Sequence, residues 1–366
     1  MSINNLFANR KDRTLYVYDG AANYIVAYIF QIILQLLFTI VLIATMTIDD
    51  RKAFSTTPLY VYIIAIINEI SIGLAPLSYS KVLGQNYYKD IGFNKKVNIP
   101  QVLMLVGISV LVICAFAPIA TYVKMFFDKT GFDSASITTL TIKNPGELVG
   151  GIILLAIVPA VLEETLYRGM IARAFARKSY VFAIFMGGFL FAIMHGNPIQ
   201  LVHQFFLGCV CCIVYFASGS IYASMIVHFT NNLIAVVGSY IAYVHPFEIP
   251  DLGFILMAVI GIILLIVALY FFIKLCNKKA SIKRGIKAFN STFAECFEKS
   301  DKVDEKQLEI DAAIKESGLE EINEIYEQTK KNITADERLK GRRALIFALV
   351  LALFVFVVNL VSGYVN

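Results

Sequence analysis

Long apolar stretches separated by short polar connections run through most of the chain, and this pattern predicts membrane-spanning helices. A helix that crosses a bilayer needs about 20 mainly apolar residues. The apolar segments fall at 23–47, 58–77, 99–125, 147–163, 181–195, 199–218, 221–243, 252–275 and 344–363. The segment 181–195 is short and is expected to be tilted, re-entrant or joined to its neighbour. We therefore predict an all-α, polytopic transmembrane bundle of about eight to nine membrane helices.

Composition agrees with a membrane protein. Of the 366 residues, 58% are hydrophobic and 16% are charged, whereas a soluble domain is about 25% charged. The net charge of +5 does not require a nucleic-acid partner, because basic loops on one membrane face give the same excess. The chain has no Gly-rich phosphate loop and no basic stripe interleaved with aromatics. We expect the lipid bilayer, and no nucleic acid, as the surroundings.

Lysine and arginine are concentrated in alternate connections, and this orients the predicted bundle. They are frequent in the N-terminal segment, in 78–98, in 164–180 and in 276–343, and sparser in the intervening loops. Cytoplasmic loops carry the excess of these residues. The sequence therefore predicts a multi-pass protein of the cell membrane with a cytoplasmic N-terminus.

The pattern divides the chain into regions. The region 278–343 is rich in Glu and Lys, with apolar residues at roughly helical spacing. It is expected to be a cytosolic helical insert, which either binds a protein partner or forms a solvated amphipathic pair that packs on itself. The predicted regions are N-terminal membrane helices at 1–143, a membrane core with the candidate chemistry at 144–245, a membrane helix at 246–277, the insert at 278–343 and a C-terminal membrane helix at 344–366.

Three charged residues interrupt the apolar segment that begins near residue 147. Glu163 and Glu164 are adjacent, and Arg168 follows one turn later. A charge at the centre of a membrane helix costs about 2.5–3.5 kcal/mol or more, so such residues usually face a bundle interior or a wet cavity. Alternatively, the helix ends at Leu162 and the charges lie among lipid headgroups.

The spacing of these residues on a helix predicts that the two glutamates point in different directions. Glu164 and Arg168 are four residues apart and can pair, while Glu163 points about 100° away and stays free. Pro159 removes one backbone hydrogen bond and is expected to kink the helix just before them.

Other polar residues in apolar segments point to hydrolysis. His195 follows Phe191 by four residues at the end of one segment, and His228 precedes Asn232 by four residues on one face of another. A free carboxylate, two histidines and an amide supply a base for water, an acid for the leaving amine and donors for an oxyanion. These groups can meet only if they lie at the same depth in the membrane. We therefore expect the helix that carries Glu163 to extend to about Ala176, which places Glu163 away from the membrane surface.

These residues fall into three motifs, and with them the chain resembles a known family. EETLYR, FAIMH and HFTNN match the EExxxR, FxxxH and HxxxN motifs of the CAAX protease and bacteriocin-processing (CPBP) family of intramembrane peptidases, in the family's order. The resemblance covers about residues 145–243. The family includes the type II CAAX prenyl endopeptidase, which removes a C-terminal tripeptide from prenylated proteins, and bacterial members linked to bacteriocin processing and self-immunity.

The resemblance implies a role for each matched residue. Glu163 and His195 would activate the attacking water, and Glu164 and Arg168 would support the site. His228 and Asn232 would stabilise the oxyanion or hold a metal. The implied substrate is a membrane-associated peptide or protein, prenylated or bacteriocin-like.

We expect a metalloendopeptidase, with zinc as the metal, although the sequence also fits a mechanism without one. His195 and His228 with a carboxylate are the ligand types of a zinc site that activates water, although the chain has no H-E-x-x-H helix. Without a metal, Glu163 would act as the general base directly, since a carboxylate in a dry cavity becomes more basic.

Two other functions use the same residues. In a proton-coupled membrane transporter, Glu163 and His195 would form a relay, but no repeated half with paired broken helices is visible. A non-catalytic immunity or scaffold protein would act through the insert.

Overall fold

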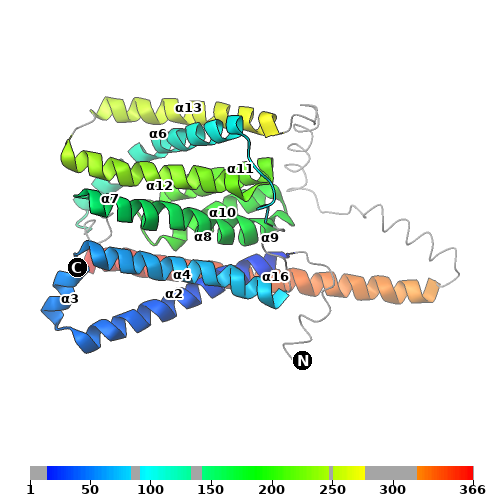
Figure 1. Ribbon diagram of the computed structural model, residues 1–366. Coiled ribbons are helices and arrows are strands. Elements are labelled where there is room, and N and C mark those ends of the chain that lie inside the picture. The colour runs from blue at the N-terminus through cyan, green and yellow to red at the C-terminus, as the bar shows by residue number, and fades with distance from the viewer. Residues whose placement is uncertain (1–14, 84–90, 133–141, 247–249, 277–319, 366) are drawn as a thin grey trace.

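The computed structural model describes residues 15–83, 91–132, 142–246, 250–276 and 320–365, and these form a bundle of helices (Figure 1). Within these ranges no strand occurs. Eight of the described helices are long and apolar enough to cross a membrane, and Tyr180–Met194 is a shorter apolar helix. The prediction of an all-α, polytopic membrane bundle is confirmed.

The helices follow the predicted apolar segments closely. They are α2 (Val17–Thr45), α3 (Ile48–Ser55), α4 (Pro58–Leu83), α6 (Ile99–Lys129), α7 (Pro145–Gly151), η2 (Ile152–Ile157), α8 (Val158–Leu166), η3 (Tyr167–Ala172), α9 (Arg173–Ala176), α10 (Tyr180–Met194), α11 (Leu201–Ser218), α12 (Ile221–Val244), α13 (Asp251–Cys276) and α16 (Glu320–Val365).

The segments from α7 to α9 form one uninterrupted helix, Pro145–Ala176, of 32 residues. The Asn144 side chain caps its start by accepting a hydrogen bond from the Glu147 backbone N–H at 3.0 Å, and proline suits the first helical position. Two stretches, η2 and η3, have π-helical hydrogen bonds. The helix therefore runs to Ala176, as predicted, and Glu163 lies well inside it.

The last helix, α16, is longer than the apolar segment that predicts it. It is continuous from Glu320 to Val365, so residues 320–343 of the predicted insert lie on the same helix as the C-terminal membrane segment. Figure 1 shows this helix continuing beyond the end of the bundle. The rest of the predicted insert, up to residue 319, lies outside the described residues.

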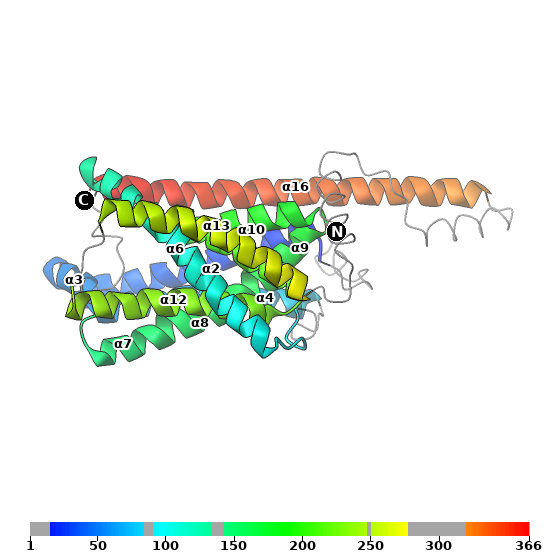
Figure 2. The same ribbon diagram turned by 90° about the horizontal axis from the view of Figure 1, so that it is seen from above.

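The long helices surround a central space. Following contacts from neighbour to neighbour, α6, α12, α8, α4, α2, α16, α10 and α11 form a closed ring, and α13 packs against α6. Figures 1 and 2 show most of these helices running roughly along one direction, while α6 crosses the others obliquely in Figure 2. The ring brings together segments that are far apart in sequence, such as α2 and α16.

Helices α10 and α11 form a hairpin in which two glycines touch. A Cβ added to Gly208 would lie 2.7 Å from the Gly188 Cα, and one added to Gly188 would lie 2.6 Å from the Cys209 Sγ. Small residues let membrane helices approach closely where packing holds them together. The loop between these helices, which follows His195, depends on this close contact.

We predict that Gly188→Ala destabilises the protein by about 1–3 kcal/mol, because the added methyl group overpacks this contact. The matched control is Gly107→Ala, an exposed mid-helix position where an added Cβ meets nothing within 4 Å. Thermal unfolding in detergent should show a lower midpoint for the first variant and an equal or higher one for the second. Equal midpoints for both variants would contradict the proposed contact.

Candidate active site

A buried ion pair lies at the base of the candidate site. Arg168 Nη1 donates to Glu164 Oε1 at 2.7 Å, and both side chains have no exposed surface. Arg168 Nη2 also donates to the Gly208 carbonyl of α11 at 3.0 Å, and its guanidinium lies 4.7 Å from the Phe191 ring centroid. The predicted pairing is present, and it links the Glu163 helix to α10 and α11.

His228 of α12 is oriented by the same carboxylate. Its Nδ1 lies 2.8 Å from Glu164 Oε1, and since an ionised carboxylate only accepts, the imidazole donates from Nδ1. Its Nε2 then faces Glu163 Oε2 at 3.9 Å. This separation is too long for a direct hydrogen bond but can be bridged by one water molecule.

Glu163 keeps a free carboxylate oxygen. The residue is buried, with 7% of its surface exposed, and its Oε2 has no hydrogen-bond partner among the described residues. The two neighbouring glutamates therefore have opposite environments, since Glu164 is held by Arg168 and His228 while Glu163 is not.

His195 caps the end of α10 and lies partly exposed at the turn that follows. Its Nδ1 lies 2.8 Å from the Phe191 carbonyl oxygen. A carbonyl only accepts, so Nδ1 carries the proton and the neutral ring presents Nε2 as an acceptor. Gly196 follows with a φ of +61°, and its carbonyl accepts from Asn359 Nδ2 of α16 at 3.3 Å.

Asn232 of α12 contacts the π-helical part of the Glu163 helix, ahead of Pro159. Pro159 has no N–H to donate to the Leu155 carbonyl four residues earlier, and Asn232 Nδ2 donates to this carbonyl at 3.0 Å. Asn232 Oδ1 accepts from Asn231 at 3.1 Å. The proline thus frees a backbone acceptor that fixes the asparagine.

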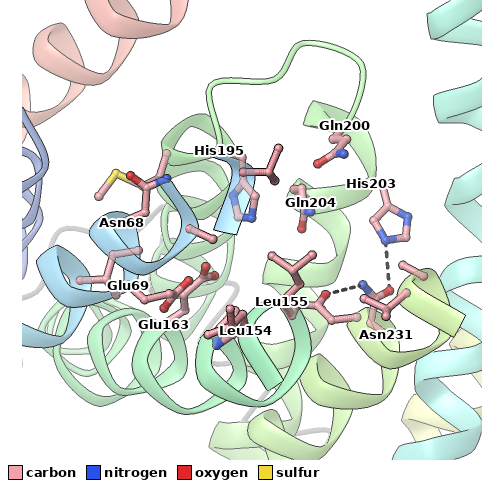
Figure 3. Close-up of a pocket in the computed structure, with 18 of the residues that line it drawn as sticks. Asn68, Glu69, Leu154, Leu155, Glu163, His195, Gln200, His203, Gln204 and Asn231 are labelled. Atoms are coloured by element: carbon pink, nitrogen blue, oxygen red, sulfur yellow. Dashed lines mark hydrogen bonds between the residues drawn. The ribbon is translucent and has the colours of Figure 1, made fainter. Parts of the chain in front are cut away.

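These side chains meet around a cavity of about 830 Å³ in the centre of the ring. Glu163, His195 and Asn232 line it, whereas His228 is not part of the lining and approaches it only through Glu163, 3.9 Å from its Nε2. Glu164 and Arg168 lie behind them and do not line it. The structure therefore brings all the predicted site residues into one region, with three of them in the cavity lining and three outside it. Figure 3 shows Glu163 and His195 at the cavity.

The cavity also contains residues that the motif analysis missed. Glu69 of α4 lies beside Glu163 (Figure 3), and His203 Nε2 of α11 lies 3.1 Å from Asn231 Oδ1. Glu69 could have been found, because it is a lone acidic residue within the apolar segment 58–77. The remaining polar lining consists mostly of amides, namely Gln31, Gln35, Asn68, Gln200, Gln204 and Asn359.

A metal site would need donor side chains that lie close together. Among the described residues, no three His, Cys, Asp or Glu side chains are arranged to hold a metal ion. The Nδ1 atoms of His195 and His228 are occupied by the Phe191 carbonyl and by Glu164. Both rings keep Nε2 free, and a histidine that binds a metal through Nε2 commonly donates its Nδ1–H in this way. The zinc site therefore stays a prediction, and no step below uses a metal.

The fold and the polar cluster define a multi-pass membrane protein with a hydrolase-like set of groups inside the bundle. Residues 145–234 match the family model described as "Type II CAAX prenyl endopeptidase Rce1-like". The match spans α7 to α12 and includes all three motifs, so it confirms the predicted family resemblance and the prediction of a CAAX-protease-like peptidase. Comparison with curated proteins and with solved structures gives no match.

We predict that Arg168→Ala destabilises the protein by about 3–5 kcal/mol, because it leaves the charge of Glu164 buried without its partner. The double variant Glu164→Gln, Arg168→Met should recover part of this loss, since no uncompensated charge remains. Lys124→Ala, which breaks an exposed pair with Asp128, serves as the control and should change stability by less than about 1 kcal/mol. Thermal unfolding in detergent measures all three, and equal effects for Arg168→Ala and Lys124→Ala would contradict the prediction.

Proposed function

We propose that the protein is an intramembrane endopeptidase that hydrolyses a peptide bond of a membrane-associated substrate. The main support is the convergence of Glu163, His195 and Asn232 on one cavity, with His228 facing Glu163 and with Glu163 Oε2 free of a hydrogen-bond partner among the described residues. The family match at residues 145–234 supports CAAX-type proteolysis. The residue roles and the substrate class are part of the proposal.

The attacking water lies next to Glu163. Glu163 Oε2 takes a proton from this water, and His195 Nε2 orients it by accepting its second hydrogen. The free oxygen of Glu163 and the fixed Nδ1 proton of His195 support these roles. A positioned base of this kind contributes about 10²–10⁴-fold to a rate.

The carbonyl oxygen of the substrate becomes negatively charged during attack and is stabilised by donors from α12. Asn232 uses one amide N–H on the Leu155 carbonyl, and the second remains for the oxyanion. His228 contributes when protonated, through Nε2, and Glu164 stabilises its positive charge through Nδ1. Preorganised donors of this kind commonly make the largest contribution to acyl-transfer catalysis.

The substrate is a peptide segment held among amide side chains. The cavity volume of about 830 Å³ is in the upper part of the range found for ligand sites. Gln31 Oε1 and Gln204 Oε1 are buried and lack hydrogen-bond partners among the described residues, so they can accept from peptide N–H groups. A prenylated CAAX-type tail or a bacteriocin-like peptide is the substrate class that the family suggests.

We propose further that the protein lies in the cell membrane with its N-terminus in the cytoplasm. The basic residues at the end of the Glu163 helix, Arg173, Arg177 and Lys178, would then face the cytoplasm. A protein partner of the region 278–343 also stays a proposal, because most of that region lies outside the described residues.

We predict that Glu163→Gln abolishes cleavage, with a loss of at least about 10³-fold in kcat, because the amide cannot accept the proton of water. Glu147→Gln, a partly exposed position on the same helix that does not line the cavity, is the matched control and should retain full activity. Cleavage of farnesylated CAAX peptides by purified protein in vesicles, followed by mass spectrometry, measures both. Wild-type activity in Glu163→Gln, or no cleavage of any membrane peptide by the wild type, would refute the proposed function.

We predict that cleavage continues after treatment with 1,10-phenanthroline, because the described donors do not form a three-ligand metal group. The rate should stay within about two-fold of the untreated protein, whereas metal loss would remove a contribution of several kcal/mol. Loss of activity that added Zn²⁺ restores would instead establish the predicted zinc site.

A further inference from the structure

We propose that Glu69 is the general acid that protonates the leaving nitrogen of the peptide. This inference rests on the proposed function and extends it to a residue outside the family match. Glu69 lies on α4, whereas the match begins at residue 145.

Glu69 belongs to the cavity and is almost fully buried. It lines the same space as Glu163, with 6% of its surface exposed, and the two carboxyl groups lie next to each other (Figure 3). Its Oε2 has no hydrogen-bond partner among the described residues. A buried polar atom of this kind calls for a partner, here supplied by the substrate.

The surroundings of the carboxyl pair determine how it shares protons. None of the described residues that line the cavity is Lys or Arg, and the titratable groups near the pair are His195, His228, Tyr28 and Tyr167. Arg168 is engaged with Glu164. While His228 is neutral, no cation lies beside the two carboxyl groups, and two adjacent carboxyl groups then share one proton, as in aspartic proteases. One glutamate therefore accepts while the other donates.

The proton transfers balance over one catalytic cycle. Glu163 takes a proton from water as the water oxygen bonds to the carbonyl carbon. The tetrahedral intermediate then collapses, the C–N bond breaks, and the nitrogen takes the proton of Glu69. The products are a carboxylic acid and an amine, and the proton on Glu163 passes to the adjacent Glu69 to restore the starting state.

The contrast with Glu164 supports this assignment. All three glutamates are buried in the bundle, but Glu164 is held by Arg168 and His228, which fix it as an acceptor. No cation or histidine among the described residues is bonded to Glu69, and the amide next to it in sequence, Asn68, has its Oδ1 engaged by Gln31 and Gln35. Glu69 is therefore free to carry and release a proton.

The test compares an amide with an ester. The substrates are a farnesylated CAAX peptide and its depsipeptide, in which oxygen replaces the scissile N–H. An alkoxide leaves far more readily than an amide anion and depends less on a proton donor. We expect Glu69→Gln to lower kcat about 10²–10⁴-fold on the peptide and less than about 10-fold on the ester, whereas Glu163→Gln lowers both alike.

Several results would overturn the assignment. Equal losses on peptide and ester in Glu69→Gln would show that Glu69 is not the acid, while cleavage by the wild type would leave the proposed function intact. Selective loss on the peptide in His195→Ala and not in Glu69→Gln would transfer the role to the histidine. If Glu69→Gln fails to fold in detergent, Glu69→Asp, which retracts the carboxyl but keeps it, must show the same selective loss.

Discussion

The buried pair of Glu164 and Arg168 organises the interior of this bundle. A charge in hydrocarbon is costly unless it is paired and hydrogen-bonded, and here each residue of the ion pair makes a hydrogen bond to a further helix. Arg168 donates to the Gly208 carbonyl of α11, and Glu164 accepts from His228 of α12. One ion pair therefore fixes three helices relative to each other and turns the His228 ring so that its Nε2 faces Glu163.

Irregular helices supply the other fixed points of the site. A helix that contains proline or ends inside the protein leaves backbone carbonyls without their usual donors. Asn232 donates to the Leu155 carbonyl ahead of Pro159, and His195 donates to the Phe191 carbonyl at the end of α10. In both cases a backbone oxygen fixes a side chain in one orientation, and the side chain still faces the cavity. The site is thus preorganised by the same irregularities that weaken its helices.

Local spacing predicts the parts of the site that lie within one helix. The pairing of Glu164 with Arg168, the free Glu163 and the extension to Ala176 follow from helical geometry and from the need for a common depth. The neighbour of Glu163 on α4 could not be predicted in this way, because the contact of Glu69 with Glu163 depends on how α4 packs against α8. The continuity of α16 through residues 320–343 could not be predicted either, because the hydropathy changes along that helix while the backbone stays helical throughout.

One side of the cavity is formed by helices that lie outside the segment carrying the three motifs. Residues 145–234, which match the peptidase family, contribute Glu163, His195 and Asn232. Gln31 of α2, Asn68 of α4 and Asn359 of α16 close the other side of the same space, and the ring of contacts joins α2 to both α4 and α16. Groups that face a substrate from these helices influence which peptide fits, while the matched segment holds the groups proposed to cleave it, apart from Glu69 of α4. Differences in specificity should therefore map to α2, α4 and α16, and differences in rate on a fixed substrate to the helices of the match and to Glu69.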